Sequence, residues 1–104
     1  MTPFETITLY IDNSAPVLAR VLYQIRQAIK ADHYPPTAVE VYIKVSAASD
    51  MRLHGDKQDR ENAGRIHSAA QKATESDWGE IATHFMAQHK EGARMLEYLP
   101  EEMR

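Results

Sequence analysis

The chain of 104 residues has no cysteine, only four glycines and no long apolar run. Without cysteine it can form no disulfide, no thiolate zinc site and no iron–sulfur cluster, and it has no thiol nucleophile. No apolar stretch approaches the roughly 20 residues that a membrane-spanning helix needs. The glycines stand singly, so no glycine-rich phosphate loop is present. We therefore expect one small domain over residues 1–104, with no secretory signal and a cytoplasmic location.

The charge of the chain is weak and unevenly placed. Twelve lysines and arginines stand against fifteen aspartates and glutamates, which gives a net charge of -3. The acidic excess lies entirely in residues 50–104, because the acids and bases of residues 1–49 cancel. A nucleic-acid-binding domain usually carries a strongly basic face, and none is evident here. Direct contact with nucleic acid is therefore disfavoured.

Two segments alternate apolar and polar residues, which is typical of a β-strand with one buried face. Residues 4–11 place three apolar side chains on one face: Ile7, Leu9 and Ile11. Residues 38–46 place four there: Val39, Val41, Ile43 and Val45. We predict a strand over each segment, and a loop over residues 47–56.

Three other segments show helical periodicity. Residues 15–31 repeat apolar side chains every three or four positions, after the N-cap candidates Asn13 and Ser14 and with Pro16 in the first turn. A second helix is expected from Asp56 or Lys57 to about Thr74. A third is expected from Ser76 or Asp77 to about Leu96, opened by a capping box of Asp77 and Glu80.

The order of these elements predicts an α+β fold, in which a β-α-β unit is followed by two helices. A sheet of two strands is weak alone, so helices must cover it or a second chain must extend it. Pairing of strand edges between two copies would make a homodimer, which stays an open alternative.

The predicted strands place Tyr10 and Tyr42 on their polar faces, where both would share one solvent-facing surface. Tyrosine is enriched at protein interfaces. Residues 50–61 mix charges densely around Gly55, as a partner-binding loop would. The alternatives are that helices cover the tyrosines and that the loop is merely solvated. The predicted partner-binding residues are Tyr10, Tyr42, Lys44, Asp50, Arg52, Asp56, Asp59, Arg60 and Glu61.

Two other classes of function stay open. The last two helices resemble a helix-turn-helix in outline, whose recognition helix would offer Glu80, Thr83, His84, Gln88 and Lys90 but no arginine near its start. A metal or catalytic site is the other alternative. It would use His84, His89, or His54 and His67 with Asp56 or Asp59, although no two histidines have the four-residue spacing of a helical metal pair. His89 lies on the apolar stripe of its helix, where a hydrogen-bonded histidine at the core edge is the more common case. We expect no cofactor, no metal and no catalytic residue.

Residues 6–29, TITLYIDNSAPVLARVLYQIRQAI, join an alternating segment, a D-N-x-A type turn and an amphipathic helix with an A-R-V-L core. This start resembles that of small accessory proteins of phages and mobile elements, anti-CRISPR proteins among them. The resemblance implies a small protein that binds and blocks host machinery, and it carries over no catalytic residue. The expected function is therefore that of a non-enzymatic, phage- or plasmid-type inhibitor. It would sterically block a nucleic-acid-handling host complex, steered to a basic partner by its acidic half.

Overall fold

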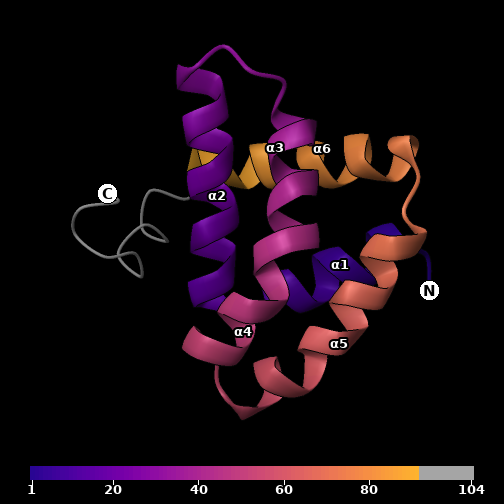
Figure 1. Ribbon diagram of the computed structural model, residues 1–104. Helices are drawn as coiled ribbons and strands as arrows, with labels where there is room; N and C mark the ends of the chain where they lie inside the picture. The colour runs from indigo at the N-terminus through magenta and orange to yellow at the C-terminus, as the bar shows by residue number, and fades with distance from the viewer. Residues whose placement is uncertain (92–104) are drawn as a thin grey trace.

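The structure is a computed structural model, and it describes residues 1–91. Its elements in order are α1 (Pro3–Asp12), α2 (Ala15–Lys30), α3 (Pro35–Tyr42), the π-helical turn η1 (Ile43–Ala47), α4 (Ala48–His54), α5 (Lys57–Lys72) and α6 (Glu75–Glu91) (Figure 1). No β-strand occurs within these 91 residues, so the predicted α+β fold is wrong. The predicted strand pairing between two copies loses its basis as well.

Helix α1 replaces the first predicted strand, and its start is fixed by a local signal. The Thr2 hydroxyl accepts a hydrogen bond from the backbone N–H of Glu5 at 3.1 Å, and the Glu5 carboxylate accepts one from the Thr2 N–H at 3.3 Å. This capping box satisfies two donors that a helix start leaves free. Ile7 and Ile11, one turn apart, are buried, whereas Leu9 between them is 44% exposed. Ile7 and Ile11 are four positions apart in the alternating pattern, and this spacing also fits one face of a helix. The burial of these two residues in the core favours the helix over the strand.

The second predicted strand is part of a nearly continuous helical segment, α3–η1–α4. Pro35 begins α3 in its first turn, where the missing N–H costs no hydrogen bond. Val39 and Ile43, again four apart, are buried, while Val41 and Val45 point to solvent. The predicted loop over residues 47–56 is also wrong, because α4 continues to His54 and buries Met51.

Helix α2 confirms the clearest sequence prediction. Of the apolar stripe of this helix, Ile29, near its end, is exposed, and the other four residues are buried: Leu18, Val21, Leu22 and Ile25. The end is a Schellman motif, in which the His33 N–H donates to the Ala28 carbonyl at 2.8 Å. Asp32 supplies the left-handed residue of this motif, with φ of 56°. Ser14 rather than Asn13 is the N-cap, but its hydroxyl makes no capping bond.

The starts predicted for α5 and α6 are correct to within about a residue, a usual uncertainty for helix ends. Asp56 caps α5 in a capping box with Asp59. At α6 the box joins Thr74 to Asp77 rather than Asp77 to Glu80. The expected end of this helix, near Leu96, lies outside the residues that the structure describes.

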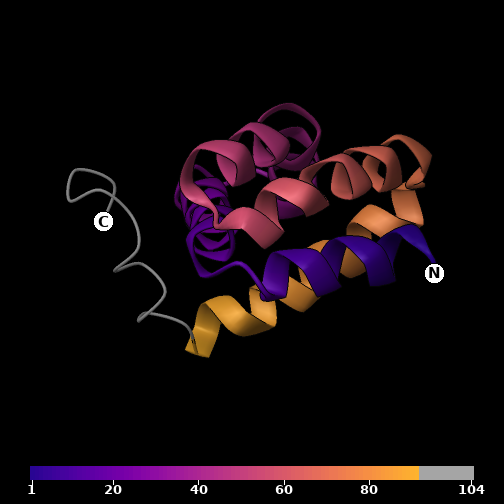
Figure 2. The ribbon, with the colours of Figure 1, turned by 90° about the horizontal axis from the view of Figure 1, so that it is seen from below.

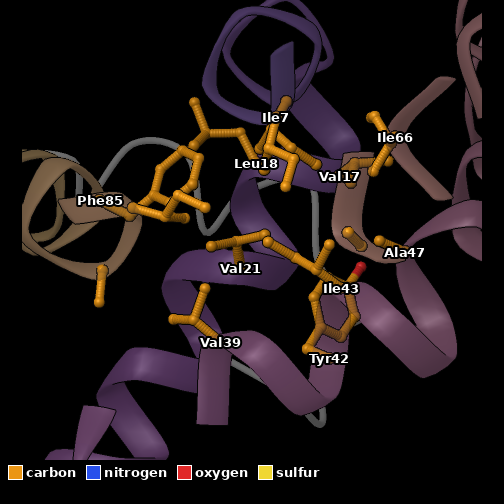
Figure 3. Close-up of a cluster of buried hydrophobic side chains, with 14 of the residues drawn as sticks. Ile7, Val17, Leu18, Val21, Val39, Tyr42, Ile43, Ala47, Ile66 and Phe85 are labelled. Atoms are coloured by element: carbon orange, nitrogen blue, oxygen red, sulfur yellow. The ribbon is translucent and has the colours of Figure 1, made fainter. Parts of the chain in front are cut away.

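The helices pack around one core to which all of the long ones contribute. In Figure 1, α2 lies beside α3 and α6 crosses behind both, and Figure 2 shows α1 running along α6. The buried cluster joins Ile7 of α1, Val21 of α2, Ile66 of α5 and Phe85 of α6 around Ile43 (Figure 3). Within residues 1–91, no helix is both long and apolar enough to span a membrane. The two main grooves of the surface lie between neighbouring helices of this core.

Candidate interaction surface

The two tyrosines of the predicted surface lie in different environments. Tyr42 is buried, and its hydroxyl donates a hydrogen bond to the Asp50 carboxylate at 2.7 Å. Tyr10 is half-buried against the core, with the Arg65 guanidinium 5.9 Å from its ring centroid. The expectation of one solvent-facing surface with both tyrosines is therefore wrong. Once residues 38–46 are helical, Tyr42 falls on the same side as the buried Val39.

Burial, with the hydrogen bond to Asp50 as a further cause, raises the pKa of Tyr42 well above its usual value near 10. Tyr42 therefore stays protonated when folded, and its contribution to stability is full below about pH 10 and declines above it, because the unfolded tyrosine ionises there. We expect Tyr42→Phe to lower the free energy of unfolding by about 1 kcal/mol at pH 7. Above pH 10 the wild type should lose up to about 1.4 kcal/mol more per pH unit than the variant.

Urea unfolding of both proteins between neutral and alkaline pH measures this difference. Tyr10, the half-buried tyrosine, provides a matched Tyr10→Phe control, which should keep the steep alkaline loss. Parallel pH profiles for wild type and Tyr42→Phe would contradict the assignment.

The charged segment 50–61 is largely structural. Asp59 is buried, and one of its carboxylate oxygens accepts hydrogen bonds from the Ser14 hydroxyl at 2.8 Å and the Asp56 N–H at 3.2 Å. Asp50 is held by Tyr42, and Asp56 caps α5. Asp56 and Asp59 thus stabilise the start of α5, and Asp50 connects α4 to α3, so each of the three aspartates has a structural partner within the chain.

The other predicted charges are exposed but do not form one cluster with the tyrosines. Arg52 and Glu61 are exposed on α4 and α5, and Arg60 donates weakly to the Gly55 carbonyl at 3.4 Å. Lys44 forms an ion pair with Glu40 at 2.6 Å, and its ammonium lies 5.6 Å from the Trp78 ring centroid. An exposed pair of this kind contributes little to stability.

A groove of about 550 Å³ between α1 and α5 brings two of the predicted residues together. Its lining includes Tyr10, Glu61, Gly64, Arg65, Ser68 and Lys72. Sequence reasoning found Tyr10 and Glu61 but not the other four. The other four are spaced so that they share one face of α5. This face could have been identified as part of a groove only if residues 3–12 had been predicted as a helix that packs against it.

A second groove, of about 650 Å³, lies between α2 and the segment α3–η1, and sequence reasoning missed it. Three large apolar side chains border it, and each is more than half exposed: Tyr34 at 69%, Val41 at 55% and Val45 at 72%. We call this the valine groove. The strand prediction had assigned Val41 and Val45 to the buried face, whereas a helix turns them away from Val39 and Ile43. The π turn lies at the same place, and such turns are frequent at functional sites.

The polar residues of α6 connect it to α1. The His84 ring nitrogen Nε2 lies 2.7 Å from an Asp12 carboxylate oxygen, and the Gln88 amide donates to the other oxygen at 2.7 Å. A DNA-recognition helix would need His84 and Gln88 to contact DNA, whereas here both side chains contact Asp12 of α1. In the part of the chain that the structure describes, no three histidine, aspartate or glutamate side chains are placed to hold a metal ion. His54 and His67 are exposed, whereas Asp59 is buried. The side chain of Lys90 lies outside the described part, and His89 is half-buried.

The comparisons with known proteins found no matching family, no matching curated protein and no matching solved structure.

Proposed function

We propose that this chain is a non-enzymatic protein-binding domain that acts in the cytoplasm by occupying a site on a host nucleic-acid-handling complex. The valine groove is the observation that carries the proposal. Isolated apolar residues on a surface are ordinary, but Tyr34, Val41 and Val45 border a single groove, and clustered exposure of this kind marks interaction sites. The resemblance of residues 6–29 to phage accessory proteins supports the inhibitory role.

The groove suits a short apolar segment or helix of the partner. Val41 and Val45 are one turn apart on the same side, and Tyr34 stands before the start of α3. Their exposure in the free chain provides apolar area whose burial stabilises a complex by about 25 cal/mol per Å² before the entropic cost of association. Gln24 and Asp32 add polar groups at the border, as specific interfaces require.

We expect Val45→Lys to remove the partner from a pull-down out of nuclease-treated host lysate, because a charge in the groove would have to be desolvated. Leu53→Lys is the matched control, since Leu53 is 75% exposed on α4 and does not line the valine groove. Both changes lie on the surface and should alter stability by no more than about 0.5 kcal/mol.

The captured complex, identified by mass spectrometry, is then assayed for nucleic-acid binding. Wild type and Leu53→Lys should block that binding, and Val45→Lys should not. A partner retained equally by both variants would contradict the valine groove as the binding surface. A complex that is captured but keeps its full nucleic-acid binding would contradict inhibition.

A further inference from the structure

The groove between α1 and α5 shares no lining residue with the valine groove. It differs also in chemistry, because two cations border it and a helical glycine leaves a gap in its wall. We propose that it is a second docking surface, and that it binds an α-helix of a partner protein carrying two carboxylates about two turns apart.

Two cations give this groove its positive charge. Arg65 and Lys72 lie on the same side of α5, and their spacing of seven residues corresponds to about 10.5 Å along the helix. Among the side chains that the structure describes, which end at His89, neither has a carboxylate within 4 Å. Arg65 donates instead to the Asn62 side-chain oxygen at 2.6 Å and lies over the Tyr10 ring. Both charges therefore stay available to carboxylates of a partner.

Gly64 provides the steric part. It is exposed in the middle of α5, and a Cβ built there would meet no atom within 4 Å. Packing inside this chain therefore does not require glycine, although glycine within a helix costs about 0.5–1 kcal/mol relative to alanine. Because Gly64 has no side chain, the groove is deeper at this position, which is next to Arg65 and one turn before Ser68. A neighbouring helix can place a small residue there and bring its backbone close.

The composition of the lining favours a protein helix over a nucleic acid. Pro3, Tyr10 and Ala69 give the groove an apolar floor between the two charges. A phosphate track carries many regularly spaced charges, and two cations are few for it. An amphipathic helix with glutamates two turns apart and alanines between them fits this groove. Its glutamates would pair with the two cations, and its alanines would pack on the apolar floor and in the gap at Gly64.

The test is a titration of the full ¹⁵N-labelled chain with a synthetic helical peptide of that design, long enough to be helical at about 15 residues or more. A peptide with lysines in place of both glutamates is the control. The chain has only four glycines, so their amide signals are readily assigned. We expect saturable shifts at Gly64 and none at Gly79, weaker binding at high salt, and no binding of the lysine peptide.

Matched variants separate the groove from general charge attraction. Gly64→Gln fills the gap without adding an apolar group and should weaken binding about tenfold or more. Gly79→Gln makes the same change in α6, where a Cβ also meets nothing within 4 Å, and should bind as the wild type does. Arg65→Glu should lose the glutamate peptide.

Equal binding of the two peptides, or unchanged binding by Gly64→Gln, would overturn the proposal. Equal displacement of the peptide by inorganic phosphate or a short single-stranded RNA would also overturn it, in favour of an anion site. Val45→Lys should bind the peptide normally, so this test and that of the valine groove can fail independently.

Discussion

Ile11→Ala is expected to lower the free energy of unfolding by about 2–5 kcal/mol, whereas Leu9→Ala should lower it by less than about 1 kcal/mol. Ile11 is completely buried in the core cluster, so truncation removes apolar contacts and leaves a cavity. Leu9 is 44% exposed on the other side of α1 and loses far less. Urea unfolding followed by far-ultraviolet circular dichroism measures both values.

This pair of variants distinguishes the helix from the strand that the sequence pattern predicted. In a strand, residues 9 and 11 share the buried face, and both truncations would be costly. In α1 they lie about 200° apart around the axis, so only one faces the core. Similar losses for the two variants would therefore refute the helical assignment of residues 3–12.

Asp59→Ala is expected to lower the free energy of unfolding by about 2–4 kcal/mol. The change removes the acceptor of the buried Ser14 hydroxyl, and an unsatisfied buried group costs about 1–3 kcal/mol. It also removes the acceptor of the Asp56 N–H, one of the two hydrogen bonds of the capping box that starts α5, which adds about 0.5–1.5 kcal/mol. Thermal and urea unfolding of purified variants measure the loss.

Two variants control this prediction. Asp59→Asn keeps a side-chain oxygen for Ser14 and should lose clearly less stability than Asp59→Ala. Glu61→Ala alters an exposed acid in the same helix turn and should change stability by less than about 0.5 kcal/mol. If Asp59→Ala were as stable as Glu61→Ala while losing a partner, Asp59 would be a binding residue, as the sequence suggested, rather than a structural one.

The candidate surfaces show where sequence reasoning was informative and where it was not. Tyr10 and Glu61 were selected for their residue type, and they line the same groove although they are 51 positions apart in the chain. Arg65 and Lys72 were not among the predicted site residues, because a groove between α1 and α5 cannot be inferred while residues 4–11 are taken as a strand. Tyr42 and Asp59 carry the right chemistry for binding, but their burial is a property of the packed fold.

The sequence by itself determined those features that depend on neighbouring residues. Helix α2, the starts of α5 and α6 and the absence of cysteine chemistry followed from periodicity, capping residues and composition. Tertiary structure alone decided the state of residues 4–11 and 38–54. Ile7 and Ile11, like Val39 and Ile43, are compatible with a strand face and with a helix face, because a spacing of four fits both periods. Packing against α2, α5 and α6 selected the helix, and with it the exposure of Val41 and Val45 and the burial of Tyr42.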